Sequence, residues 1–134
     1  MKIIRLCIGT NDGKNIAKTH MGDTRYFYIY DLFENSEYEF IGDRINTVKN
    51  MDHAKPEKMK EIIKTVKDAD IFVARLKSPN FIKIANKTKY QPVVVKEDNI
   101  IGSLIIIGRS FQELYDYVIR RRNGDIFDII PELS

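Results

Sequence analysis

The amino-acid sequence predicts an α/β fold with a mixed sheet, in which an antiparallel hairpin is followed by βα units and helices lie on both faces. Two strand-like segments near the N-terminus are separated only by the turn Glu34–Ser36. After residue 55, short apolar segments alternate with longer amphipathic ones. The 134 residues suffice for one domain with a sizeable core, and we expect residues 1–134 to form it.

Three strands are expected before residue 46. Lys2–Ile8 is rich in apolar and β-branched residues, as in a buried strand. Arg25–Leu32 contains three consecutive aromatic residues, and Glu37–Arg44 alternates well enough to be its hairpin partner. Asn46–Lys55 has no clear period, so we expect a loop there, and this loop contains His53.

A helix and a buried strand follow. Pro56 suits the first turn of a helix, and Asp68–Asp70 ends it. Its apolar face has the spacing i, i+3, i+4 and i+7, made by Met59, Ile62, Ile63 and Val66. Ile71–Ala74 is short and wholly apolar, which indicates a buried strand.

Ser78 and Pro79 predict the start of a second helix, with serine as cap and proline at the first position. The expected inner face of this helix is formed by Phe81, Ile82 and Ala85. Gln91–Lys96 follows as another strand, and Pro92 favours an edge position or a strand that begins just after it.

The C-terminal part is expected to hold one more strand and one helix. Leu104–Ile107 has four consecutive apolar residues, too few for a helix of their own. Ser110 and Glu113 form a capping box for the last helix, which Asn123 ends. Asp125–Ser134 is a tail with apolar residues that can dock on a neighbouring element.

Composition excludes several classes of protein. A net charge of +3 is too small to indicate nucleic-acid binding. The single cysteine, Cys7, excludes an internal disulfide and an all-cysteine metal site within one chain. No apolar run has the roughly 20 residues of a membrane span, and Met1–Arg5 does not resemble a signal peptide. We therefore expect a cytoplasmic protein without a membrane partner.

The most informative motif lies in the first quarter of the chain. The strand that ends at Ile8 leads into the turn Asn11–Gly13, and a loop then presents His20 beside Gly22. Loops held by a rigid sheet are frequent positions for binding residues. We expect any ligand to bind at this loop.

These residues resemble the dinitrogenase iron-molybdenum cofactor biosynthesis family, which includes small nitrogenase cofactor-carrier proteins and the C-terminal domain of a cofactor-assembly enzyme. The corresponding motifs are Thr10–Gly13, His20–Gly22 and an aromatic strand from Tyr26 to Asp31. A second histidine often precedes the first helix in that family, and His53 has this position. The order of elements agrees through about Lys96, and a final helix is also expected there.

The resemblance implies a ribonuclease-H-like α/β fold and a non-enzymatic function. It implies binding of an iron-sulfur or iron-molybdenum cluster, or its precursor, with a cluster-assembly protein as the partner. His20 is the implied ligand and His53 a weaker one, while Thr10, Asn11, Asp12 and Gly13 match the first loop.

The sequence departs from the family pattern in two places. Members have a glycine-rich turn after the fourth strand, whereas Ala74–Pro79 contains no glycine. Residues 97–109 read as an insertion. A small interaction or regulatory protein that kept the fold and lost the cluster site is therefore an alternative.

The candidate ligands also have plain structural interpretations. Cys7 is either a small buried apolar residue or a thiolate anchor near the His20 loop. His20 and His53 are either solvated loop residues or ligands. A preassembled cluster contributes its own sulfides and needs few protein anchors, whereas a bare zinc ion requires about four ligands.

Charged residues suggest two further hypotheses. Asp12, Asp31 and Asp70 could hold magnesium in a nuclease, although the Asn-Asp-Gly turn explains Asp12 without a metal. A positive rim that attracts anions could be formed by Lys14, Lys18, Arg75 and Lys77. The basic run Arg120–Arg122 is expected to be a solvated helix end.

Overall fold

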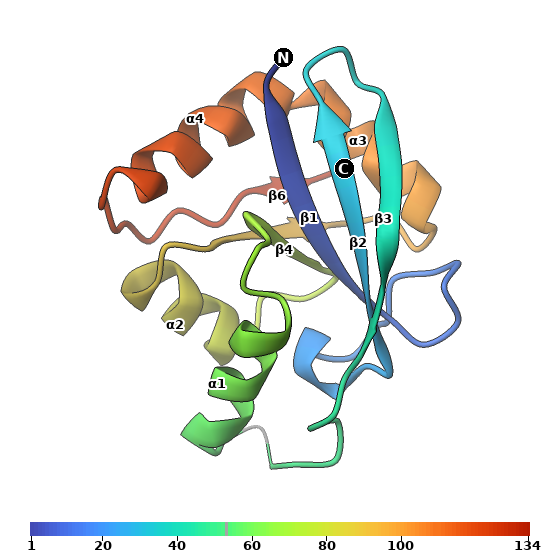
Figure 1. Ribbon diagram of the computed structural model, residues 1–134, viewed down its shortest axis with the longest axis vertical. Coiled ribbons are helices and arrows are strands. Elements are labelled where there is room, and N and C mark those ends of the chain that lie inside the picture. Colours follow the sequence, from blue (N-terminus) through green and yellow to red (C-terminus); the bar gives the residue numbers. More distant parts are fainter. Residues whose placement is uncertain (53) are drawn as a thin grey trace.

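The computed structural model describes residues 1–52 and 54–134 and contains one six-stranded sheet in the order β3-β2-β1-β4-β5-β6. The strands are β1 (Ile3–Thr10), β2 (Tyr26–Phe33), β3 (Tyr38–Ile45), β4 (Ile71–Ala74), β5 (Gln91–Val95) and β6 (Glu132–Leu133). The first three pair antiparallel, whereas β1, β4, β5 and β6 are parallel neighbours. The predicted mixed sheet with an N-terminal hairpin is confirmed, and Figure 1 shows its strong twist.

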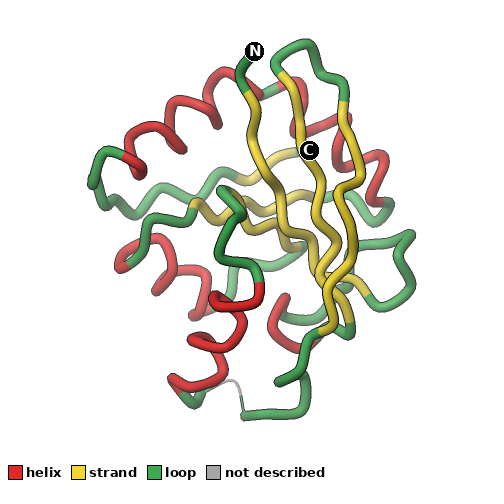
Figure 2. Tube along the Cα trace, in the orientation of Figure 1, coloured by secondary structure: helices red, strands yellow, loops and turns green. Residues whose placement is uncertain are grey.

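Helices cover both faces of the sheet, as predicted (Figures 1 and 2). The helices of the described residues are η1 (Met21–Asp23, a 3₁₀ turn), α1 (Pro56–Thr65), α2 (Pro79–Lys87), α3 (Ile100–Arg109) and α4 (Phe111–Arg122). Helices α3 and α4 pack on one face of the sheet with Ile4, Leu6 and Ile8 of β1. Helices α1 and α2 pack on the other face with Cys7. This division follows from the alternation of side chains along a strand.

One predicted strand is wrong, because Leu104–Ile107 belongs to helix α3. The side chain of Asn99 accepts a hydrogen bond from the Gly102 amide at 2.9 Å and so caps the helix at its N-terminus. Buried Ile100, Leu104 and Ile107 follow the helical spacing i, i+4 and i+7. Asn99 and Gly102 interrupt the apolar pattern of the sequence, and the four apolar residues that follow are too few to show the helical period.

The capping box predicted at Ser110 does not form. Helix α4 starts directly where α3 ends, and Ser110 makes no side-chain cap hydrogen bond. Its amide instead donates to the Ile107 carbonyl at 3.0 Å, closing the last turn of α3. In α2, the prediction for Ile82 is wrong, since this residue is 43% exposed and Ile84 is buried instead.

The prediction for Pro92 is wrong, because this residue lies within β5 and β5 is an inner strand between β4 and β6. The short strand β6 pairs only with Val94 and Val95, so no partner needs the missing amide hydrogen of Pro92 on that side. The C-terminal tail therefore docks on the sheet as β6.

Within the described ranges, no helix has the length and apolar character needed to cross a membrane.

The expectation of a solvated basic helix end is wrong for Arg121, which is 2% exposed. Its guanidinium donates to Gln91 Oε1 at 2.7 Å and to three backbone carbonyls at 2.8–3.1 Å, of Ala85, Thr88 and Phe127. Burial and neighbouring Arg120 lower the pKa of Arg121 to about 10, so it stays charged at neutral pH. Arg121 thereby ties α4 to α2, β5 and the C-terminal segment.

Candidate functional site

The candidate site lies where two parallel strands end. From β1 the chain continues to β2 on one side of the sheet, whereas from β4 it continues through α2 to β5 on the other side. Such switch points, at the carboxyl ends of the strands, are the usual ligand positions in open α/β sheets. His20 lies in the segment after β1, and Ser78 lies in the segment after β4.

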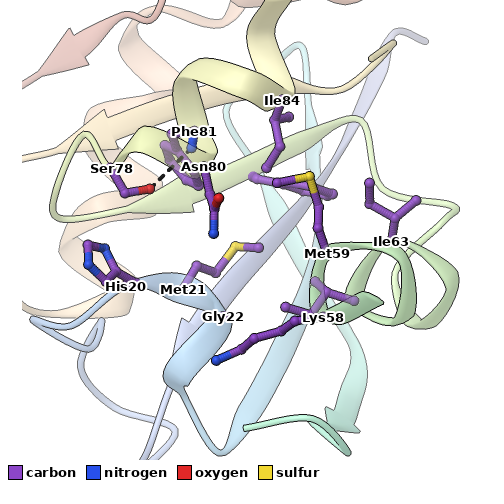
Figure 3. Close-up of a pocket in the computed structure, with 12 residues that line it drawn as sticks. His20, Met21, Gly22, Lys58, Met59, Ile63, Ser78, Asn80, Phe81 and Ile84 are labelled. Carbon is purple, nitrogen blue, oxygen red and sulfur yellow. Dashed lines mark hydrogen bonds between the residues drawn. The ribbon is translucent and has the colours of Figure 1, made fainter. Parts of the chain in front are cut away.

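A small pocket opens at this point, on the face of the sheet covered by α1 and α2 (Figure 3). Its walls come from η1, α1 and α2, and Phe72 of β4 contributes from the sheet. The lining residues are His20, Met21, Gly22, Lys58, Met59, Ile62, Ile63, Phe72, Ser78, Asn80, Phe81 and Ile84. The pocket is small, with a volume of about 30 Å³.

His20 occupies the N-cap position of η1, where its carbonyl accepts a hydrogen bond from the Asp23 amide at 3.0 Å. Its side chain is half-buried at the pocket, and Figure 3 shows the imidazole on the side of Ser78 and Asn80. The Ser78 hydroxyl is engaged as the N-cap of α2, accepting from the Phe81 amide at 3.1 Å. His20 thus supplies an imidazole to the wall of an otherwise largely apolar pocket.

A buried lysine forms the opposite wall. Lys58 of α1 is 2% exposed, and its ammonium donates to the Met51 carbonyl at 2.8 Å and the Lys49 carbonyl at 3.3 Å. It also forms an ion pair with the Asp23 carboxylate of η1. Lys58 therefore joins η1 and the segment before α1 to that helix.

Gly22 lets η1 approach α1 closely. A Cβ atom at this position would lie 3.1 Å from Cδ1 of Ile62, tighter than ordinary van der Waals contact. The Gly22 carbonyl also accepts a hydrogen bond from the Asn46 side-chain amide at 2.8 Å. Gly22 lines the pocket, and its contacts with Ile62 and Asn46 explain this glycine through packing.

The signature Asn11–Gly13 builds the loop and does not line the pocket. The Asp12 carboxylate accepts hydrogen bonds from the Asn15 and Lys14 amides, both at 2.9 Å. These bonds lower the pKa of Asp12 to about 2. Thr10 Oγ1 accepts a hydrogen bond from the Gly13 amide at 3.0 Å, within the same turn.

Two further contacts fix this loop relative to β2. Asn11 Oδ1 accepts a hydrogen bond from the Arg25 amide at 2.9 Å. Gly13 has a φ of 75°, and a Cβ there would collide with the Tyr28 hydroxyl. The bond between Asn11 and Arg25 therefore joins the two ends of the segment that presents His20, and Gly13 lets the start of this segment pack closely on Tyr28 of β2.

Cys7 is fully buried in the sheet, next to Phe72 of β4 in the parallel register. Burial raises the pKa of its thiol, which favours the neutral form over the thiolate that a metal needs. Cys7 does not line the pocket. His53 lies outside the described residues. Among the described residues, no group of three His, Cys, Asp or Glu side chains is placed to hold a metal ion.

The three aspartates of the nuclease hypothesis do not converge. Asp12 follows the carboxyl end of β1, whereas Asp70 Oδ2 accepts from the Arg5 amide near the opposite end of that strand. Asp31 pairs with the Arg5 guanidinium at 2.8 Å. This arrangement gives no support to a two-magnesium site.

The proposed positive rim is partly neutralised. Arg75 forms an ion pair with Asp98, and the Lys14 carbonyl accepts from the Ile100 amide at 2.9 Å. The loops after β1 and β4 are therefore both joined to the segment that precedes α3. Lys18 and Lys77 are exposed.

Lys58 is a site residue that was not predicted, although the sequence contains a signal for it. Lys58, Ile62 and Val66 have the spacing i, i+4 and i+8, so they lie on one face of a helix. Ile62 and Val66 were expected to be buried, and both are. Lys58 shares the helix face of these two residues, so its side chain is also expected to be buried, and a buried ammonium needs an acidic partner.

Comparison with known proteins places the fold and the site in context. A sequence model described as dinitrogenase iron-molybdenum cofactor matches residues 2–105. The match includes the loop motif and His20, runs past residue 97, where an insertion was expected, and ends within α3. Helix α4, expected as the family's final helix, lies beyond the match. A search of curated proteins found no match.

Proposed function

Because this chain belongs to the dinitrogenase iron-molybdenum cofactor family, we propose that it is a non-enzymatic carrier of an iron-sulfur or iron-molybdenum-type cluster, or of a precursor. The observation that supports this function most is the position of His20. Its imidazole stands at a pocket at the switch point of the sheet, on a loop fixed by the family motif.

The donor atoms suit a cluster better than a bare ion. His20 supplies one imidazole, and Met21 and Met59 supply thioether sulfurs that point into the pocket (Figure 3). Such a set is too small for a tetrahedral zinc site. A preassembled cluster contributes its own sulfides, so that one protein ligand and an apolar wall suffice to hold it.

The size of the pocket determines how the cargo would sit. A space of about 30 Å³ has room for a water molecule and not for a metal-sulfur cluster. The cluster would therefore rest at the mouth, against His20 and the ends of α1 and α2. An exposed cargo held by one ligand can be transferred, which suits carriage between assembly proteins more than permanent storage.

The test is anaerobic incubation of the purified protein with a cluster donor, followed by gel filtration, metal analysis and visible absorption. We expect the wild type to retain iron and the His20→Ala variant to lose it. A His20→Cys variant provides a matched control, because a thiolate at the same position can replace the imidazole as an iron ligand. Absence of retention by the wild type would overturn the proposal.

A second candidate is an interaction protein that has lost cluster binding. Two observations favour it: the turn Ala74–Pro79 has no glycine, and its Arg75 forms an ion pair with Asp98. Under this function, His20→Ala would leave both partner binding and stability unchanged. Partner capture with the wild type and the variant, analysed side by side with metal retention, distinguishes the two functions.

A further inference from the structure

A second and larger depression lies between α1 and α2, next to the pocket. Its volume is about 290 Å³, against about 30 Å³ for the pocket. Met59 and Ile63 of α1 and Asn80 of α2 line both. We call this depression the α1–α2 groove. A body lying in the groove would therefore reach the edge of the pocket.

Four lysines line the groove, two on each side. Lys55 and Lys60 belong to α1 and its N-cap, and Lys83 and Lys87 belong to α2. All four are exposed, and within residues 1–52 and 54–134 none of them forms an ion pair. The groove thus combines positive charge at its sides with apolar Met59 and Ile63.

The positive charge on the α2 side belongs to a longer basic segment of the chain. Residues 71–96 contain six basic residues and no acidic one. The whole chain has 22 basic and 19 acidic residues, so the remainder of the molecule is net acidic. Segregation of this kind creates a field that attracts and orients an acidic partner.

The residues that line the groove are those of a surface that binds a polypeptide, and not those of a surface that binds nucleic acid. Surfaces that bind single-stranded nucleic acid combine positive charge with aromatic side chains for base stacking, and arginine is frequent among their cations. Among the described residues that line this groove, none is aromatic and none is an arginine. A floor with methionine and isoleucine between lysines matches an amphipathic segment with acidic residues at its sides.

We propose that the α1–α2 groove is the docking site for an acidic amphipathic segment of a partner protein. Nine-residue α2 is about 13 Å long at 1.5 Å per residue, which accommodates a helical segment of two to three turns. The docked segment would lie beside the pocket. The docking does not require that the pocket holds a cluster.

The test uses a fluorescein-labelled helical peptide of 14 residues with glutamates on one face and leucines on the other. We expect it to bind the full chain, to shift amide resonances of α1 and α2, and to weaken as salt is raised. A peptide with glutamine in place of every glutamate should bind at least about tenfold more weakly.

The protein variants separate the groove from general charge. Lys83→Glu combined with Lys87→Glu should weaken binding about tenfold or more. Lys18→Glu combined with Lys96→Glu has the same charge change on exposed residues outside the groove, and should alter binding less than about twofold. Thermal unfolding of both variants verifies that they fold.

Three outcomes would overturn the proposal: no binding of the acidic peptide below millimolar concentration, equal weakening by both pairs of substitutions, or tighter binding of an oligonucleotide of equal charge to the same residues. The His20→Ala variant should bind the peptide normally. Loss of cluster retention and loss of peptide binding therefore identify separate failures of the two proposals.

Discussion

Substitution of Lys58 by methionine tests whether the buried ammonium fixes the wall of the pocket. Methionine keeps most of the aliphatic stem and removes the charge. Asp23, Met51 and Lys49 then lose the group that bonds to them. Asp23 is one-third exposed, so that water can reach its carboxylate again.

The loss of stability in each variant depends on the exposure of the charged group that remains. Hydrogen bonds to charged groups contribute roughly 1.5–3 kcal/mol each, and the release of lysine rotamers and resolvation offset part of the loss. We expect Lys58→Met to lower the free energy of unfolding by about 2 kcal/mol. Asp23→Ala should cost more, about 3–4 kcal/mol, because it leaves an ammonium that is 2% exposed without its counter-charge.

The assay is equilibrium unfolding in urea at pH 7 of both single variants and the double variant. Because the two residues contact each other, the double variant should cost at least about 1 kcal/mol less than the sum of the singles. Amide resonances of Met21–Asp23 report whether η1 moves. Unchanged stability and unchanged η1 resonances in Lys58→Met would refute the reasoning, as would a smaller cost for Asp23→Ala.

Three further predictions concern other parts of the molecule. Arg121→Ala should lower the free energy of unfolding by about 3–5 kcal/mol, since it leaves buried acceptors without a donor. Arg120→Ala removes an exposed side chain and should cost less than about 1 kcal/mol. Unfolding in urea measures the stability of both variants. Cys7 should react with a thiol reagent at pH 8 only as the protein unfolds, and fully in guanidinium, because it is 0% exposed and burial raises its pKa; rapid labelling of the folded protein would contradict this. The Arg44 guanidinium lowers the pKa of Asp68, so the stability from this carboxylate is present above its ordinary pKa of 3.8 and is lost as the pH falls below it. Asp68→Asn should therefore cost about 1 kcal/mol at pH 7, after allowance for solvent screening, and the difference measured by thermal unfolding should shrink below about pH 4.

The elements that sequence predicts well are those with a complete local pattern. Ser78 and Pro79 begin α2 as expected, and the Ser78 hydroxyl accepts from the Phe81 amide. The prediction at Leu104–Ile107 failed because a helix capped by Asn99 and crossed by Gly102 leaves only four consecutive apolar residues. In that segment the helical period emerges only when Ile100 is counted with the later residues.

The site residues also divide into those that have a local sequence pattern and those that do not. His20 and Gly22 are adjacent to a recognisable motif, and both line the pocket. The contributions of α1 and α2 depend on which helices cover that face of the sheet, a property of the tertiary fold. Arg121 shows this limit most clearly, because its partners lie up to 36 residues away in the chain.

The loop motif and the pocket have separable functions. Asn11 and Gly13 hold the loop against β2, and the Thr24 hydroxyl donates to the Met21 carbonyl at 2.8 Å. These contacts determine where His20 stands, whereas side chains from α1 and α2 determine what surrounds it. The loop can therefore keep the His20 imidazole in place while substitutions in α1 and α2 change what surrounds it. Because Met59 lines both the pocket and the α1–α2 groove, a substitution at this residue would change the surroundings of His20 and the groove together.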